Sequence, residues 1–255
     1  MIDIHSHILP RIDDGAKNME ESIMMAKLAV QEGIHTIIAT PHHKNENYEN
    51  KKLDIIQKVE LLNDVLLSEN INLQVLPGQE TRIYGEIIED LEKDEVLTLN
   101  NGGEFLFVEF PSGHVPRYSE KLLSDIQFEG ITPIIVHPER NQELMENPTL
   151  LYNFVKKGSL SQITAASVVG KFGKNIQKFS MKLIESNLTH FIASDAHNIK
   201  SRKFNMSAAY QTVEKKFGID MMDMFLFNTE QLVNDKNIHK EIPERIKKTK
   251  FLGLF

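Results

Sequence analysis

The sequence predicts an α/β protein, an irregular barrel of seven βα units that is one strand short of the eight-stranded form. Short apolar runs alternate with segments of helical periodicity along most of the chain. Runs such as residues 36–39 and 133–136 are apolar without alternation, which is typical of parallel strands covered by helices on both faces. The 255 residues contain no Pro/Gly/Ser-rich linker and no repeat, so we expect residues 1–255 to form a single domain.

The predicted elements follow one another in βα order. Asn18 and Glu21 form a helix-start signal, and Gly33 marks the end of that helix. Residues 53–68 have an apolar stripe at helical spacing, which predicts a second helix. Two later helices end at Gly130 and Gly158. We expect strands at residues 2–6, 35–40, 73–76, 105–110, 132–136, 161–164 and 190–193. The later helices are expected at residues 119–129, 148–157, 175–186, 206–217 and 220–226, with one more near the C-terminus.

The composition excludes several function classes. A net charge of -7 argues against general affinity for nucleic acid, and the absence of cysteine excludes disulfides, Cys-ligated zinc and thiolate nucleophiles. No signal peptide starts the chain, and no apolar run approaches the ~18 residues of a membrane span, so we expect a soluble, cytoplasmic protein. We expect residues 247–250, a basic cluster, to be a solvated helical turn and the apolar residues 251–255 to pack on the barrel; docking on a partner is the alternative for both.

Nine side chains of metal-binding type fall at or just beyond the predicted carboxyl ends of six strands. Because the carboxyl ends of parallel strands share one rim of a barrel, we expect these side chains to meet at one mouth. The sixth strand, ending near Thr164, contributes none. The nine residues are His5, His7, Asp14, His42, Glu80, Glu109, His137, Asp195 and His197.

Spacing and chemistry both favour a cluster of metal ions. His5 and His7 are two residues apart, so at strand spacing both imidazoles face one side, and Asp195 and His197 repeat this pattern. Mixed imidazole and carboxylate sites suit manganese, iron or zinc, and nine ligands exceed the need of one ion. We therefore expect two or three ions, with Glu80 as a natural bridge, and an activated water as the nucleophile.

Two arginines and five other histidines lie near these positions or elsewhere along the chain. Arg140 and Arg202 follow His137 and Asp195 closely, where a guanidinium can hold phosphate oxygens; an ion pair with a rim carboxylate is the alternative. His114 falls in a rim loop that a substrate can reach, although an ordinary loop role is the simpler interpretation. The remaining four, expected to face away from the mouth or to lie in the C-terminal tail, are His35, His43, His190 and His239.

These motifs resemble the polymerase-and-histidinol-phosphatase (PHP) superfamily of metal-dependent phosphoesterases. Its opening HxH pair and following DG are matched by His5-Ser6-His7 and Asp14-Gly15. Later motifs match at Thr40-Pro41-His42, Gly78-Gln79-Glu80, Glu109-Phe110-Pro111, His137-Pro138-Glu139-Arg140 and Ser194-Asp195-Ala196-His197. The resemblance implies a distorted, TIM-like (β/α)7 barrel of the PHP type, usually with three metal ions.

Within that superfamily the chain looks like the bacterial manganese-dependent protein-tyrosine phosphatases of capsular and exopolysaccharide loci. The segment from Ser194 to Arg202 also matches, except that Lys203 stands where a proline often follows. The resemblance implies one ion held by His5, His7, Glu80 and Asp195, a second by Glu80, Glu109 and His137, and a third by Asp14, His42 and His197. It also implies that Arg140 and Arg202 contact phosphate. Asp13 is an alternative to Asp14 as a ligand.

The leading hypothesis is therefore a Mn²⁺-dependent protein-tyrosine phosphatase, with iron, zinc or cobalt as alternative metals. Its implied partner is the phosphotyrosine tail of a membrane-associated bacterial tyrosine kinase. Binding to that kinase would bring the protein to the membrane without insertion into it. A small-molecule phosphatase such as a histidinol phosphatase is the first alternative. A 3'–5' exonuclease, disfavoured by the net charge, and a non-catalytic metal-binding module are the others.

Overall fold

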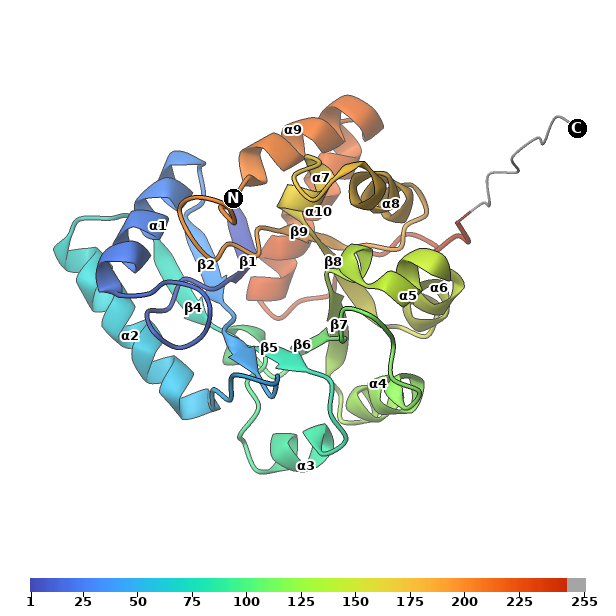
Figure 1. Cartoon of the computed structure of the whole chain (residues 1–255), viewed down its shortest axis with the longest axis horizontal. Helices are drawn as coiled ribbons and strands as arrows, with labels where there is room; N and C mark the ends of the chain where they lie inside the picture. The colour runs from blue at the N-terminus through green and yellow to red at the C-terminus, as the bar shows by residue number, and fades with distance from the viewer. Residues whose placement is uncertain (247–255) are drawn as a thin grey trace, which may run out of the picture.

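The computed structural model describes residues 1–246 as a ring of parallel strands surrounded by helices (Figure 1). All seven predicted strands are present, and two short strands extend the second and third. The strands are β1 (Ile2–Ser6), β2 (Thr36–Ala39), β3 (His42–His43), β4 (Gln74–Pro77), β5 (Glu80–Arg82), β6 (Phe105–Glu109), β7 (Thr132–Val136), β8 (Leu160–Thr164) and β9 (Phe191–Ala193).

Hydrogen bonding divides these strands into a three-stranded sheet, β1-β2-β4, and a six-stranded sheet, β3-β5-β6-β7-β8-β9. The two sheets occupy one ring, because β2 pairs with β4 and β3 pairs with β5 in an unbroken register. β2 and β3 are thus two fragments of one strand position, interrupted before His42 by Pro41. β4 and β5 are two fragments of the neighbouring position, interrupted before Glu80 by residues 78–79. Counted this way the ring has seven strand positions within residues 1–246, and the prediction of a distorted α/β barrel is confirmed.

The ring is not closed by a strand ladder between β9 and β1 in the part of the chain that the structure describes. A single parallel bridge joins Ser6 to Ala196. Two backbone hydrogen bonds support it: Asp195 N–H donates to the His5 carbonyl at 2.9 Å, and His7 N–H donates to the Ala196 carbonyl at 2.8 Å. The barrel therefore closes at the residues that the sequence singles out as metal ligands.

The helices lie outside the ring, and the first begins as predicted, with Asn18 accepting a hydrogen bond from Glu21 N–H at 2.9 Å. Short helices at α3, α5 and α7 were not predicted, because each has fewer than seven residues and shows too little periodicity. The helices are α1 (Met19–Gln31), α2 (Lys52–Ser68), α3 (Ile87–Glu92), α4 (Ser119–Phe128), α5 (Gln142–Glu146), α6 (Thr149–Lys156), α7 (Ala165–Val168), α8 (Lys174–Glu185), α9 (Met206–Phe217) and α10 (Ile219–Val233).

The last helix corrects the sequence prediction. The helix expected at residues 220–226 continues to Val233, and residues 234–246 contain no further helix. The basic cluster 247–250 and the apolar residues 251–255 lie outside the described residues. Among the described helices, none is long and apolar enough to cross a membrane.

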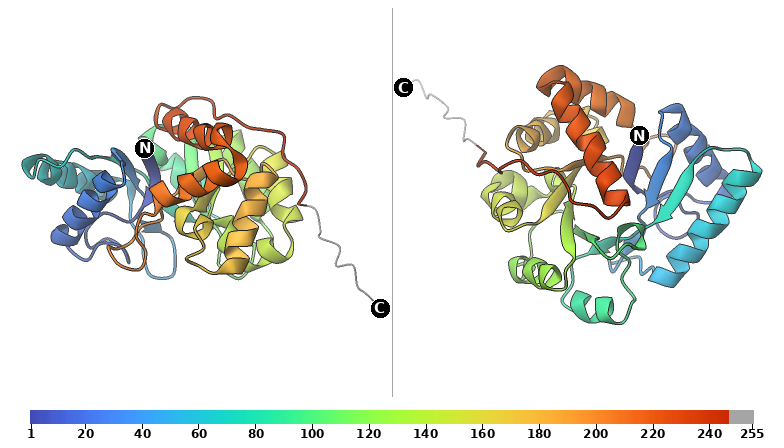
Figure 2. Two further views of the ribbon diagram at one scale, coloured as in Figure 1. Left: turned by 90° about the horizontal axis from the view of Figure 1, so that it is seen from above. Right: turned by 180° about the vertical axis from the view of Figure 1, so that it is seen from behind.

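Two apolar cores hold the layers together. A larger core fills the space between the ring and the helices, and a smaller one, including Ile4, Phe107 and Phe191, fills the ring itself. Leu232 at the end of α10 and Ile238 beyond it belong to the inner core. Figure 2, right, shows α10 lying across the back of the ring. The amino ends of the strands are thus covered, which leaves the carboxyl ends as the accessible mouth.

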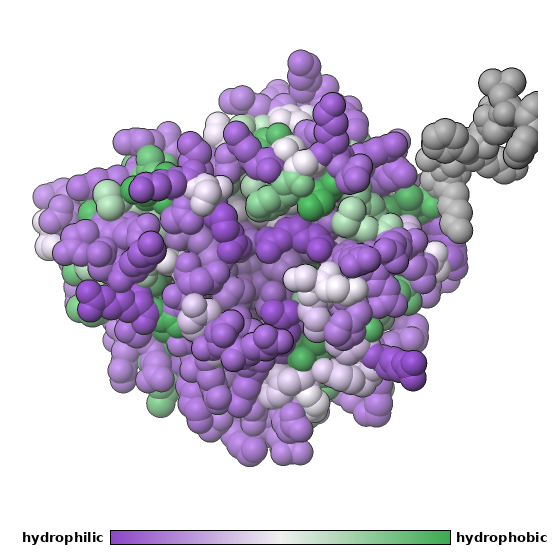
Figure 3. Space-filling model, viewed as in Figure 1, coloured by the Kyte–Doolittle hydropathy of each residue, from purple (hydrophilic) through white to green (hydrophobic). Residues whose placement is uncertain are grey.

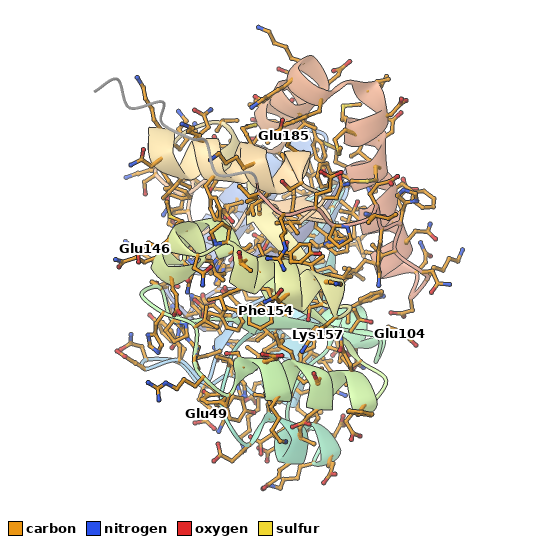
Figure 4. All side chains as sticks on the ribbon, turned by 90° about the vertical axis from the view of Figure 1, so that its right-hand side faces the viewer. Glu49, Glu104, Glu146, Phe154, Lys157 and Glu185 are labelled. Carbon is orange, nitrogen blue, oxygen red and sulfur yellow. The ribbon has the colours of Figure 1, made fainter. Side chains whose placement is uncertain are left out.

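Figure 4 views the ring from the side. Glu49, in the loop after β3, and Glu104, just before β6, lie at opposite edges of the molecule. The first edge is the mouth and the second is the covered end.

Candidate metal centre

A bulge in β1 allows the first histidine pair to face the mouth. Asp3 pairs with Ile37 but Ser6 pairs with Ala39, so β1 contains one residue more than β2 over this stretch. The bulge lets Ile4 fill the inner core while His5, directly after it, faces the mouth beside Phe107, with ring centroids 5.0 Å apart. The predicted pairing of His5 and His7 holds, since their Nε2 atoms are 3.4 Å apart.

The first group of converging side chains consists of His5, His7, Glu80 and Asp195. Glu80 Oε2 lies 3.4 Å from His5 Nε2 and 3.2 Å from His7 Nε2. Asp195 Oδ1 lies 3.5 Å and 3.3 Å from the same two nitrogens. All four side chains are buried, and they are the set that the family resemblance implies for one ion.

The second group consists of His42, Glu80 and Glu109, with His42 Nδ1 at 2.9 Å from Glu80 Oε2 and 3.8 Å from Glu109 Oε2. His137 approaches the same group through its Nε2 atom, 2.7 Å from Glu80 Oε1. The family resemblance implies His137 for this set and His42 for the third. The structure brings both residues to Glu80, which lies at the middle of the arrangement.

The third group consists of His7, Asp14, His42 and His197. Asp14 Oδ1 lies 3.5 Å from His42 Nε2 and 3.3 Å from His197 Nε2. The imidazoles of His7 and His197 stack with centroids 3.7 Å apart. All nine predicted residues therefore meet at one mouth, and in each of the three groups the ligand atoms lie within 4.8 Å of one another.

The hydrogen bonding of these atoms fits bound cations. Among the described residues, five buried polar atoms of the cluster have no hydrogen-bond partner: His42 Nδ1, Glu80 Oε2, Glu109 Oε2, Asp195 Oδ1 and His197 Nε2. His42 Nδ1 and Glu80 Oε2 lie 2.9 Å apart but are not in hydrogen-bond geometry, so both atoms remain available to a bound cation. An unpaired buried acceptor is costly, and bound cations would satisfy these carboxylate oxygens and imidazole nitrogens together.

The pKa values in the cluster reflect this concentration of opposite charge. Burial lowers the pKa of His7, yet Asp13, Asp195 and Glu80 together raise it well above its usual value. Burial raises the pKa of Glu80, yet His42 and His5 hold it well below its usual value. The carboxylate is thus in the ionised form that a metal ligand requires, and bound cations would take the place of the protons on the histidines.

Glu109 behaves differently from Glu80. Burial and the neighbouring Glu80 raise the pKa of Glu109 to about 7, although His42 and Arg82 act in the opposite direction. The carboxylates of Glu80 and Glu109 belong to one group of converging side chains, so they repel each other unless a cation lies between them.

Two of the candidate ligands have a strained backbone. His137 has φ of 34° and Asp195 has φ of 53°, both in the left-handed region that costs a non-glycine residue roughly 1–2 kcal/mol. At His137 this conformation turns the chain into the 3₁₀ helix η2 (Pro138–Arg140), which brings Arg140 back over the mouth. The strain thus places both an imidazole and a guanidinium at the cluster.

Both predicted arginines lie on the same carboxylate. Arg140 Nη1 and Arg202 Nη2 donate to Asp195 Oδ2, the latter at 2.9 Å, and Arg202 Nη1 lies 3.5 Å from Asp14 Oδ2. The ion pairs named as the alternative interpretation are therefore present. The side chains of Arg140 and Arg202 are 28% and 29% exposed, so both guanidiniums also border the open mouth.

With this geometry described, comparison with known proteins assigns the chain to a family. Residues 1–234 match the model of the capsular polysaccharide synthesis family CpsB/CapC. The chain belongs to the CpsB/CapC family. It is 49% identical over all 255 residues, the full length of both chains, to a Bacillus subtilis protein named tyrosine-protein phosphatase YwqE. It is 31% identical over 244 residues, 93% of this chain and all of the relative, to tyrosine-protein phosphatase CpsB of Streptococcus pneumoniae.

Solved structures agree with this assignment. A chain from a study of YwqE and CpsB, described as unique metal-dependent tyrosine phosphatases, superposes with a TM-score of 0.95 and 50% identity, covering 97% of this chain and 100% of that chain. A phosphotriesterase homology protein from Escherichia coli superposes with a TM-score of 0.57 at 10% identity, covering 87% of this chain and 94% of that chain, which shows a shared fold only. The resemblance to the capsule-locus family is confirmed.

In this CpsB/CapC chain, Asp13 and Asp14 have separate positions. Asp13 Oδ2 lies 2.7 Å from His7 Nδ1 and accepts from His42 N–H at 3.2 Å, so it supports two candidate ligands from behind. Asp14 faces His42 and His197 instead, which favours Asp14 as the ligand. Gly15 is required beside them, because a Cβ there would lie 2.1 Å from the His7 carbonyl oxygen.

Sequence reasoning missed a supporting residue on the sixth strand position, β8. Gln162 Oε1 lies 2.9 Å from His5 Nδ1, which orients the ring so that Nε2 faces the cluster. The available signal was a glutamine inside a strand whose five residues are all buried. Gln162 is not itself a candidate ligand, because its contact is with the side of His5 that faces away from the cluster.

Asp3 is a second missed residue. It is fully buried, and it accepts from Ser194 N–H at 2.8 Å, from Ser194 O–H at 2.5 Å and from His5 N–H at 3.4 Å. These bonds join β1 to the segment after β9, where the strand ladder is missing. Asp3 thus fixes His5 relative to Asp195, and its position just before the HxH pair was the signal for it.

The other histidines follow the expected pattern. His35 and His190 precede β2 and β9 at the covered end of the ring. His43 is buried with its ring toward Tyr84, at a centroid distance of 6.3 Å, while His42 faces the cluster. His114 is exposed in the loop after β6, and His239 interacts with Glu241 at 3.1 Å.

Proposed function

We propose that this chain is a metal-dependent protein-tyrosine phosphatase that acts in capsular or exopolysaccharide synthesis. The supporting observation is the cluster at the mouth, in which eight histidines and carboxylates converge in three groups, His137 contacts Glu80, and five buried atoms of the described residues have no hydrogen-bond partner. Full-length identity of 49% to a named tyrosine-protein phosphatase supports the substrate class. We also propose that residues 1–255 act as one phosphoesterase domain.

In this proposal the nine residues hold two or three divalent ions, with manganese as the metal. Such ions supply Lewis acidity and an activated water for phosphoryl transfer. Glu80 contributes to two of the three groups, which suits a carboxylate shared between ions. The chain has no cysteine, so no thiolate can attack phosphorus.

The two arginines have a role that their exposure supports. Each guanidinium presents several N–H donors, and only some are used on Asp195 and Asp14. We propose that Arg140 and Arg202 hold the non-bridging oxygens of the phosphate and stabilise the charge that develops there. Tyrosinate is a comparatively good leaving group, so a strong general acid is not required.

The proposed substrate is phosphotyrosine on the tail of a bacterial tyrosine kinase. The relatives named as tyrosine-protein phosphatases and the family's link to capsular polysaccharide synthesis support it. Figure 3 shows a mostly hydrophilic face that is hollowed near its centre, which suits a flexible polar peptide. In this proposal the enzyme works in the cytoplasm, at the membrane only through its kinase, and does not act on nucleic acid.

The test is phosphate release by metal-stripped protein refilled with manganese, on a phosphotyrosine peptide and on histidinol phosphate in parallel. We expect faster release from the peptide, lost with a chelator and in His137→Ala. His239→Ala, at an exposed histidine away from the mouth that is no candidate ligand, is the control and should keep activity. Faster release from histidinol phosphate would contradict the substrate, and release that persists with chelator would contradict the metal.

A further inference from the structure

A polar pocket of about 400 Å³ opens beside the metal centre. Its walls are the loop 44–47 after β3, Arg82 and Ile83 at the end of β5, and Pro111 and Ser112 after β6. The volume falls within the range of ordinary ligand-binding sites. None of the nine candidate ligands and neither Arg140 nor Arg202 lines it, so it is a separate feature of the mouth.

Arg82 links this pocket to the metal centre. Its Nη2 atom lies 3.2 Å from Glu109 Oε2, and its Nη1 atom donates to the Phe110 carbonyl at 2.9 Å. The guanidinium therefore forms the wall between a candidate ligand and the pocket. Arg140 and Arg202 lie on Asp195, which follows β9 at the opposite end of the six-stranded sheet from β3 and β5.

The loop wall is held in shape before any ligand binds. Asn45 Oδ1 accepts hydrogen bonds from Asn47 N–H at 3.0 Å and Tyr48 N–H at 2.8 Å, which fixes the turn. The charged side chains that line the pocket are Lys44, Arg82 and Glu46. Lys44 and Arg82 are each paired with a carboxylate, Lys44 with Glu49 at 2.8 Å and Arg82 with Glu109 at 3.2 Å. Because Glu109 is a candidate metal ligand, Arg82, 24% exposed, is the pocket cation that lies beside the metal centre.

We infer that this pocket binds the peptide segment next to the phosphotyrosine and that Arg82 favours a carboxylate side chain there. The inference rests on the proposed function, since the phosphate group itself belongs at the nine-residue cluster. An extended peptide advances about 3.3–3.6 Å per residue, so a pocket bordering Glu109 is within reach of the first residues beside the phosphotyrosine. Backbone and polar side chains of the peptide suit the amide and hydroxyl groups of Asn47 and Ser112.

The experiment compares three phosphotyrosine peptides that differ only in glutamate, glutamine or lysine beside the phosphotyrosine. Each kcat/KM is divided by that for p-nitrophenyl phosphate, which has no flanking peptide. We expect the glutamate peptide to exceed the glutamine peptide about three- to fivefold, the range of a partly exposed ion pair, with lysine the poorest. In Arg82→Gln the glutamate-to-glutamine ratio should fall to about one, whereas Arg117→Gln, an exposed arginine outside the pocket, should keep the native ratio.

A second variant tests the pocket without touching Arg82. Ser112→Trp fills the space and should lower the ratio of peptide to p-nitrophenyl phosphate kcat/KM about tenfold for all three peptides. Equal ratios for the glutamate and glutamine peptides in the native enzyme, or a preference that survives in Arg82→Gln, would overturn the inference.

Peptide binding measured by fluorescence anisotropy separates the two proposals, because it needs no turnover. A lower Kd for the glutamate peptide in a protein that releases no phosphate would retain the pocket and reject the proposed function. Turnover with identical Kd and kcat/KM for the three peptides would retain the function and reject the pocket.

Discussion

Buried histidines occur at both ends of the barrel, but their surroundings differ. At the mouth, His7 lies among Asp13, Glu80 and Asp195, and its pKa is raised well above the usual value despite burial. At the covered end, His190 accepts a hydrogen bond from Ser161 N–H at 3.1 Å, and burial followed by the charge of Lys240 lowers its pKa to about 3.

The comparison shows that burial alone does not identify a functional histidine. Each end encloses imidazole in protein, yet only the mouth combines several imidazoles with ionised carboxylates and leaves five polar atoms unpaired within the described chain. His190 has a backbone partner and needs nothing more, whereas the mouth is complete only with cations. Substitutions at the two ends should therefore differ in their effects on metal binding, activity and stability.

The largest effect is expected from Glu80→Gln, which keeps the size of the side chain and removes the charge shared by two ligand groups. Metal content and phosphatase activity should both fall by more than the 10- to 100-fold typical of losing an outer-shell partner. Metal is measured by mass spectrometry after gel filtration, and activity by phosphate release. Glu49→Gln, an exposed change at the same edge of the molecule (Figure 4), is the control; a fully metallated, active Glu80→Gln enzyme would contradict the arrangement.

The second prediction concerns Asp13→Asn, which leaves every candidate ligand in place. An amide is a weaker partner for His7 Nδ1 than a carboxylate at 2.7 Å, so metal affinity should fall roughly 10- to 100-fold. The measurement is competition with a chelator of known affinity. A larger loss in Asp13→Asn than in Asp14→Asn would exchange the roles that we assign to the two residues.

The third prediction concerns the seam between β1 and β9. Asp3→Ala removes the acceptor for Ser194 N–H and O–H, and each buried donor left without a partner costs about 1–3 kcal/mol. Urea unfolding of the metal-free protein should show this loss. If Asp3 also positions His5 against Asp195, metal affinity should fall under conditions where the variant is still folded. A destabilised variant with native affinity would limit Asp3 to a structural role.

Much of this arrangement could be predicted because barrel geometry converts position along the chain into position in space. Each candidate ligand stands at a strand end or in the loop just beyond it, so knowing the strands is enough to gather them at one mouth. The broken strands at Pro41 and Gly78 did not disturb this prediction, because the register continues across the breaks.

The supporting contacts could not be predicted in the same way. The bonds of Gln162 to His5 and of Asp3 to Ser194 connect residues 157 and 191 positions apart, so the neighbouring sequence marks each residue as unusual but does not identify its partner. Likewise, the choice between Asp13 and Asp14 depends on a loop turn that packs Gly15 against His7. Such details follow from tertiary packing, which strand periodicity does not encode.

Near neutral pH the smallest effect is expected at the covered end, and this effect grows as the pH falls. The pKa of His190 is about 3 in the folded protein and near 6.5 when unfolded, so below pH 6.5 the unfolded state binds the additional proton. Stability should therefore fall with pH from about 6.5 toward 3, with a slope of up to about 1.4 kcal/mol per pH unit from this residue. His190→Gln should have a shallower slope than the native chain in urea unfolding at constant metal occupancy. His239→Gln, at an exposed histidine, should keep the native slope; a native slope in His190→Gln would mean that this end of the barrel already accommodates a charged imidazole, and the contrast with the mouth would then depend on the carboxylates alone.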